Sequence, residues 1–280
     1  MKAALPPPKI KPFAKVLAEA IADLKRFGYS DSQRVFRWVV LLRRALGNSM
    51  PPLREMEHLL RLRLTTEFDR LVLRKALLRM HPGVSRFTLD RVEPQLRQEL
   101  DRRIVAAADL IKLNRDEAIE KTLRRFSGWS TSIPVGGTAA STAEPKIDAT
   151  RPLQSLGFIE RRVLIDQAHK LRANLSQIVA KESGAVAAVW HSHWRQAGYD
   201  YREDHKERDE HVYLIRGSWA HGRGLVKPGN DGYLDGITQP GEEVFCRCRC
   251  VYLTAISALP EDMITAKGHS ELERVRAHVG

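Results

Sequence analysis

Tyr201 to Leu253 reads YREDHKERDEHVYLIRGSWAHGRGLVKPGNDGYLDGITQPGEEVFCRCRCVYL and holds all three cysteines of this 280-residue chain. Sulfurs two residues apart on an extended chain lack the geometry of a disulfide framework, so metal binding is a better explanation of this cluster. Zinc is the metal that favours Cys/His sites. The candidate ligands in the stretch are His205, His211, Cys246, Cys248 and Cys250.

Two strands are expected here. Residues 211–216 (HVYLIR) have the composition of a strand, and residues 244–253 alternate so that the cysteines share one face. Pairing of the two strands would bring His211 beside Cys246 and Cys248, with His205 or Cys250 as a fourth ligand. On a regular strand such sulfurs stand about 6 to 7 Å apart, whereas a tetrahedral zinc site needs about 3.8 Å. A bulge or a strand end is therefore required.

The same pattern has a simpler interpretation. Cysteines are often small buried hydrophobes, and here Arg247 and Arg249 would face outward while His211 is hydrogen-bonded in the core. The sequence alone supports both interpretations.

Outside this stretch the chain is predicted to be mainly helical. Apolar residues recur at helical spacing, and Ser30 or Asp31 can cap the second helix while Thr88 or Asp90 can cap the fourth. The expected helices cover residues 13–27, about 32–47, 51–80, 88–125 and 157–181. The fold class expected is α+β, mostly α, with a helical basic N-terminal half and a second helical region followed by a small β unit.

Residues 184–198 (GAVAAVWHSHWRQAG) are interpreted as one more short helix. His191 and His193 would then point roughly 200° apart, so they could not hold one metal ion together. This pair is accordingly not predicted to be a metal site.

Composition predicts where the chain divides. Residues 127–145 are rich in Ser, Thr, Gly, Ala and Pro and almost without charge, which is typical of a linker. The predicted divisions are a basic helical domain with a proline-rich arm (1–126), a flexible linker (127–156), a helical plus small β domain (157–253) and a tail of unreadable function (254–280).

The net charge of +12 is confined to the N-terminal part. Residues 1–130 hold 27 Lys and Arg against 15 Asp and Glu, whereas residues 131–280 hold 19 of each. This asymmetry predicts a polyanionic partner, either nucleic acid or an acidic protein surface. A helical surface solvated by arginine explains it equally well. The candidate contact residues are Arg61, Arg63, Arg70, Arg74, Lys75 and Arg79.

The sequence gives no sign of a membrane segment. No window approaches the roughly 18 uninterrupted apolar residues of a membrane helix. Residues 1–13 are too rich in proline, and lack the apolar core, for a secretory signal. We expect no membrane partner and a location in the cytoplasm or in a particle assembled there.

The order of several residues resembles the phage head morphogenesis family, the minor head proteins of the phage Mu protein F type. Members typically show an Asp, an Arg-x-x-His or Cys-x-x-Cys pair, a Gly, and Asn-Cys-Arg-Cys after Pro-Gly or His-Pro. The matching residues here are Asp204, Arg208, His211, Gly217, Pro240, Gly241, Cys246, Arg247 and Cys248. Phe245 replaces the Asn, and Cys250 adds a third cysteine. The resemblance covers about residues 156–253 and leaves the basic N-terminal half unexplained.

The resemblance implies a low-copy structural protein of a tailed-phage head, located in the virion, associated with the portal and capsid interior, oligomeric in the particle and without catalytic turnover. Its role would be head assembly or DNA packaging and ejection. Packaged double-stranded DNA, or an acidic portal or scaffold surface, would then be the partner of the basic half.

Two enzymatic alternatives remain. A zinc-dependent nuclease or other DNA-processing protein would use a metal to activate water and arginine to hold phosphate, but neither a carboxylate-rich two-metal constellation nor a His-Asn-His run is present. An ADP-ribosylating or protease activity would need Ser, His and Asp residues at usable spacing, and no such spacing is found.

Overall fold

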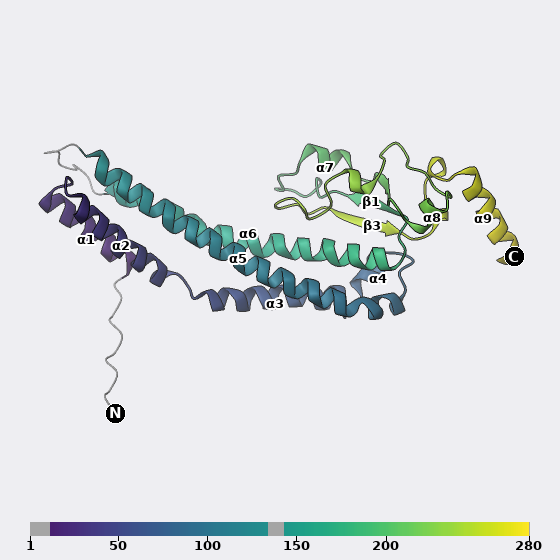
Figure 1. Ribbon diagram of the computed structural model, residues 1–280, viewed down its shortest axis with the longest axis horizontal. Helices are drawn as coiled ribbons and strands as arrows, with labels where there is room; N and C mark the ends of the chain where they lie inside the picture. Colours follow the sequence, from purple (N-terminus) through teal and green to yellow (C-terminus); the bar gives the residue numbers. More distant parts are fainter. Residues whose placement is uncertain (1–11, 134–142, 280) are drawn as a thin grey trace, which may run out of the picture. The chain divides into compact units, whose positions relative to one another are not determined.

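A computed structural model describes residues 12–133 and 143–279 of the chain. Helices dominate, and a small antiparallel sheet follows them, so the predicted α+β, mostly α class is confirmed (Figure 1). The helices are α1 Phe13–Phe27, α2 Ser32–Ser49, α3 Leu53–Leu71, α4 Ala76–Met80, α5 Arg86–Ser132, α6 Ala143–Glu182, α7 Glu203–Glu207, α8 Trp219–Gly222 and α9 Ala266–Val279. The strands are β1 Ala187–His191, β2 Val212–Leu214 and β3 Arg249–Leu253. Short 3-10 turns are η1 Leu234–Gly236, η2 Ile256–Ala258 and η3 Glu261–Met263.

The chain forms two compact units, each made of two separate stretches. The first consists of Met1–His58 and Ala108–Val163, and the second of Leu59–Ala107 and Leu164–Gly280. Helices α5 and α6 contribute to both. This grouping differs from the predicted division at residues 127–156, because the contacts made by the two long helices interleave the N-terminal and C-terminal parts of the chain.

The predicted linker is largely helical where it is described. Residues 127–132 belong to α5 and residues 143–156 to α6, while residues 134–142 lie outside the described residues. The proline-rich arm over residues 1–11 lies outside them too. Small and polar residues are therefore compatible with helix here, because tertiary packing routinely overrides weak propensities.

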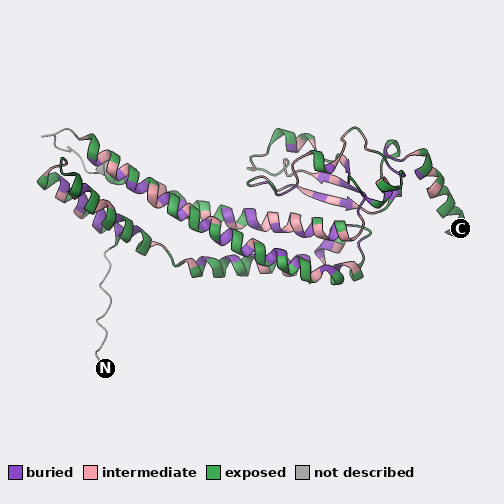
Figure 2. Cartoon of the chain, viewed as in Figure 1, coloured by how far each residue is buried: buried purple, intermediate pink, exposed green. Residues whose placement is uncertain are grey.

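The first unit has its core between α1, α2 and the adjoining parts of α5 and α6. Asp31 caps α2 as expected, since its side chain accepts from the backbone N–H groups of Gln33 and Arg34. Figure 2 shows buried residues alternating with exposed ones along these helices. The core residues include Leu17, Ala20, Leu24, Leu42, Leu46, Leu123 and Phe126.

The helical part of the second unit packs α3, α4 and segments of α5 and α6 around one apolar cluster. Its members include Leu64, Phe68, Leu77, Leu96, Leu171 and Leu175. Lys75, at φ 58°, separates α3 from α4. Ser85 precedes α5 and its hydroxyl accepts from the backbone N–H of Thr88, so the predicted cap at Thr88 or Asp90 was placed too late.

The sheet has the order β2–β1–β3, with both pairs antiparallel. Ala188 on β1 lies opposite Tyr213 on β2 and opposite Tyr252 on β3. Ala188 and Trp190 belong to an apolar cluster that also contains Ala180 of α6, while Ala187 belongs to a second cluster with Leu214. The central strand is thus buried on both faces.

The prediction of a helix over residues 184–198 was wrong. Gly184, at φ 69°, follows the end of α6, and the chain then enters β1. A strand buried on both faces shows an unbroken apolar run instead of alternation, and such a run cannot be distinguished from a buried helix by periodicity.

The tail expected over residues 254–280 is ordered through Val279 and packs on the β unit. Met263, Ile264 and Leu272 join the apolar cluster around Ala187, and α9 contains the short helix expected near Glu271. None of the helices in the described part of the chain is long and apolar enough to cross a membrane.

Candidate metal centre

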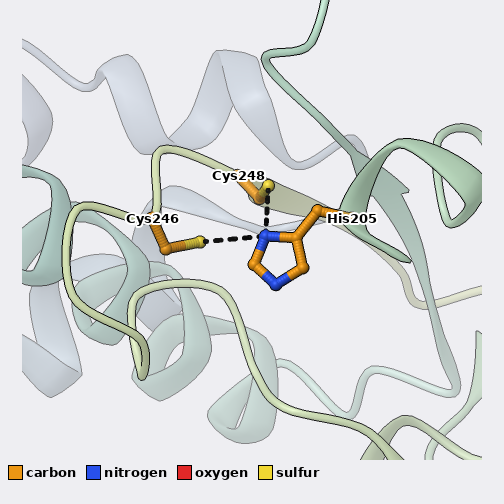
Figure 3. A group of neighbouring side chains, drawn as sticks. All are labelled: His205, Cys246 and Cys248. Atoms are coloured by element: carbon orange, nitrogen blue, oxygen red, sulfur yellow. Dashed lines mark hydrogen bonds between the residues drawn. The ribbon is translucent and has the colours of Figure 1, made fainter. Parts of the chain in front are cut away.

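Three buried side chains meet in the second unit: His205, Cys246 and Cys248. Their ligand atoms all lie within 4.8 Å of one another. His205 Nδ1 is 3.8 Å from Cys246 Sγ and 3.5 Å from Cys248 Sγ (Figure 3). A tetrahedral zinc ion with standard bond lengths would place nitrogen and sulfur about 3.6 Å apart. The described residues therefore contain a group that could bind a metal ion.

Local backbone conformation brings the two sulfurs together. The strand expected from residue 244 begins only at Arg249, so Cys246 and Cys248 lie in the irregular segment before β3. Phe245 has φ 63°, in the left-handed region that non-glycine residues rarely adopt. The requirement for a bulge or strand end is thus met. His205 is supplied by the short helix α7 and is only 2% exposed.

Side chains from other elements hold the peptide groups on both sides of Cys246. Asp166, buried on α6, accepts from Phe245 N–H at 2.7 Å. The Tyr199 hydroxyl donates to Phe245 O at 3.2 Å and accepts from Arg247 N–H at 3.3 Å. Arg202 donates to Val244 O at 3.1 Å. Residues 244–247 are therefore fixed by neighbours that contribute no metal ligand themselves.

The two thiols shift each other's pKa values in opposite directions. Although burial opposes it, the interaction with Cys248 together with His205 lowers the pKa of Cys246 to about 4. The same contact with Cys246, reinforced by burial, raises the pKa of Cys248. A bound metal ion would displace the thiol protons, because thiolates and not thiols bind zinc.

The other ring nitrogen of His205 faces carboxylates. Nε2 is 3.5 Å from Glu243 Oε2 and 3.9 Å from Asp204 Oδ2, and it has no hydrogen bond within the described residues. The ring also packs edge-on against Trp190, with centroids 5.5 Å apart. A carboxylate behind a ligating histidine fixes its orientation and raises its basicity.

Two predicted ligands lie outside this group. The side chain of His211 is half exposed and its Nδ1 is 2.8 Å from Asp231 Oδ1. The expected pairing of its strand with the cysteine strand was wrong, because β1 lies between β2 and β3. Cys250 lies on β3, opposite Trp190 of β1. Its side chain is buried, and burial raises the pKa of its thiol to about 12.

The predicted basic residues differ in their pairing. Arg70 forms an ion pair with Glu67 at 2.6 Å, and Arg61 is 3.7 Å from Asp101. Arg79 donates to the carbonyl oxygen of Arg74. Within the described residues, no ion pair is found for Arg63, Arg74, Lys75 and Arg79. These four cations are available to an external anion.

Sequence reasoning missed Asp166 and Tyr199, which support the loop, and Glu243, which lies behind the His205 ring. One signal was present: Phe245 stands where the resembled family has Asn, and Asn is enriched in the left-handed region. That exchange pointed to a special backbone conformation before Cys246. Nothing local in the sequence connects Asp166 with a segment nearly 80 residues away.

The chain was compared with family models, curated proteins and solved structures. None of the three comparisons finds a match.

Proposed function

We propose that this chain is a minor structural protein of a tailed-phage head and that its His205–Cys246–Cys248 group holds one structural zinc ion. The proposal starts from the resemblance of residues 156–253 to the phage head morphogenesis family. It places the protein in the virion, at the portal and capsid interior, with a role in head assembly or in DNA packaging and ejection.

The observation that carries the proposal is the meeting of the Cys246-Arg247-Cys248 element with a buried histidine. This element is the most specific part of the resemblance, and its two sulfurs lie beside His205 Nδ1 at distances that suit zinc. His205 takes the place that the sequence had suggested for His211. A buried imidazole whose Nδ1 faces two sulfurs, and whose Nε2 faces a carboxylate, fits a ligand better than a core residue.

Metal analysis tests the zinc part. The purified protein should contain one equivalent of zinc, which Cys246→Ser or His205→Ala should remove. Cys250→Ser is the matched control, since Cys250 is equally buried but lies outside the group. A metal-free protein that is equally stable with and without a chelator would contradict the zinc site.

Mass spectrometry of purified particles tests the structural part. The protein should be found in particles of the source phage at a copy number far below that of the major capsid protein. Its absence from particles would refute the virion assignment while leaving the zinc site intact.

A zinc-dependent nuclease is the second candidate, favoured by one observation. The described residues supply only three ligand atoms within 4.8 Å of one another, and catalytic zinc sites keep one position for water or substrate. Supercoiled plasmid incubated with the zinc-loaded protein decides between the two. Nicking that is lost in Cys246→Ser would favour the nuclease, and intact plasmid favours the structural role.

A further inference from the structure

A second polar site lies beside α6 and adjoins the candidate metal centre, because Cys248 lines it as well. A cavity of about 10 Å³ is lined by His169, Arg172 and Ser176 of α6 and by Arg247 and Arg249 around the Cys248 segment. All of these residues belong to the second unit. Three arginines and a histidine thus line one small cavity.

Little negative charge offsets these arginines. Arg172 pairs with Glu67 at 3.1 Å, but Glu67 also pairs with Arg70. The guanidinium of Arg247 lies over the ring of Tyr199, and its one hydrogen bond within the described residues is to the neutral side chain of Gln196. For the side chain of Arg249, the described residues offer neither a hydrogen bond nor an ion pair. A half-buried guanidinium without a partner is costly, because the protein interior screens its charge less than water does.

The histidines respond to this positive field. Burial, together with the charges of Arg172 and Arg247, lowers the pKa of His169 to about 4. Burial and the charges of Arg249, Arg247 and Arg172 lower the pKa of His193, whose ring lies edge-on to His169 with centroids 6.4 Å apart. The His169 ring makes no hydrogen bond within the described residues, so its N–H remains available as a donor.

We propose that Arg172, Arg247 and Arg249, together with the His169 N–H, form a binding site for a phosphate group. Arginine suits this ligand because its planar fork donates two parallel hydrogen bonds to phosphate oxygens. The cavity has room for about one oxygen atom or water molecule. The site therefore takes one oxygen of a phosphate inside and leaves the remainder at the opening, as with inorganic phosphate or a backbone phosphodiester of nucleic acid.

None of the proposed phosphate contacts is a zinc ligand, although Cys248 borders the cavity, so the outcome of the test does not depend on the proposed function. Binding of inorganic phosphate to the full chain is followed by phosphorus NMR, and binding of a short DNA duplex by fluorescence anisotropy, both at constant ionic strength set with chloride. Arg249→Gln should weaken the binding of the effective probe about tenfold, the effect of one charge-assisted contact. Arg249→Lys keeps the charge but loses the planar fork, so its affinity should lie between those of the unsubstituted chain and Arg249→Gln.

Arg276→Gln is the matched control, because it removes the same charge from α9, away from the cavity. Binding of phosphate alone identifies the free ion as the ligand, and binding of the duplex identifies the backbone phosphodiester. No binding of either probe above the chloride background would overturn the proposal, as would an equal loss in Arg276→Gln.

A measurement on the unsubstituted chain guards against variants that fail to fold. Phenylglyoxal modifies accessible arginines, and the modified peptides are identified by mass spectrometry. Phosphate or the duplex should protect Arg249 and Arg247 at least severalfold more than Arg276. Equal modification of all three with and without the probe refutes the site.

Discussion

Tyr199 shows how one hydroxyl can position a candidate metal ligand without belonging to the ligand group. It bonds to the peptide groups before and after Cys246, so it fixes the direction in which that sulfur points. Asp166 supports the same turn from α6 and partly offsets the unfavourable left-handed conformation of Phe245. Supporting contacts of this kind typically change metal affinity by about 10- to 100-fold.

Tyr199→Phe should therefore lower zinc affinity by about tenfold while the protein stays folded. A competition titration with a chromophoric chelator measures the affinity, and the cobalt-substituted protein should show altered thiolate-to-metal absorption. Tyr201→Phe is the control, since its hydroxyl is not part of the loop's hydrogen bonds. If both variants bind zinc as tightly as the unsubstituted chain, Tyr199 does not position the ligand loop.

His81 makes the fold sensitive to acid. It is fully buried, its Nδ1 accepts from Tyr252 N–H at 3.4 Å, and burial followed by the charge of Arg249 lowers its pKa to about 4. The unfolded chain binds this proton near pH 6.5, so its contribution to stability is present above that pH. It is lost as the pH falls from about 6.5 towards 4.

His81→Asn should remove this pH dependence, because the Asn side chain can still accept from Tyr252 but does not titrate. Urea unfolding between pH 4 and pH 8 measures the effect. We expect a loss of on the order of 3 kcal/mol for the unsubstituted chain relative to the variant across that range. Parallel pH profiles for the two proteins would disprove the role of His81.

Helix α9 approaches the β unit so closely that one residue of it must be glycine. A Cβ on Gly268 would collide with the carbonyl oxygen of Leu225 and lie 2.8 Å from Ile264 Cγ2. Gly268→Ala should therefore destabilise the protein by about 1 to 3 kcal/mol, the usual cost of overpacking.

Gly157 in α6 provides the opposite case, since a Cβ added there would have nothing within 4 Å of it. Gly157→Ala should stabilise by about 0.5 to 1 kcal/mol, because alanine is the better helix former. Thermal unfolding followed by circular dichroism compares the two variants. Stabilisation of both variants would show that helix propensity and not packing governs both positions.

Elements with local signals were predictable from the sequence. The apolar spacing of residues 13–27 and the cap at Asp31 depend on neighbours within a few positions, and both are confirmed. Strand β1 was missed because burial on both faces removes the alternation on which strand prediction depends. Missing β1 also explains the error in the metal site. Without β1 between them, β2 and β3 were expected to pair, and His211 was therefore placed beside Cys246 in preference to His205.

The predicted binding of a polyanion by the basic residues needs a test that leaves both compact units intact. Cutting the chain near residue 130 would separate stretches that share a core, so substitution is the better approach. Replacing Arg63, Arg74 and Arg79 by Gln removes cations that have no ion pair within the described residues.

If these arginines contact DNA phosphates, the slope of log affinity against log salt should fall by up to about 3. Filter binding or anisotropy between 50 and 300 mM salt, roughly the range over which such slopes are measured, provides the data. The control variant replaces Arg216, Arg223 and Arg274 by Gln. It removes the same number of charges from positions outside α3 and α4. An unchanged slope in the first variant would assign this basic surface to solvent or to an acidic protein partner.

The interleaving of the two units also sets the order in which the chain can mature during synthesis. The first unit needs residues up to Val163, so residues 59–107 are made early but wait for partners in the second half of α6. Leu64 and Phe68, which pack in the same cluster as Leu171 and Leu175, stay without them until that segment leaves the ribosome. At about 5 to 20 residues per second, Cys248 follows Val163 by roughly 4 to 17 s. A nascent chain thus exposes an apolar helix surface to chaperones before the Cys246 and Cys248 of the candidate metal site are made.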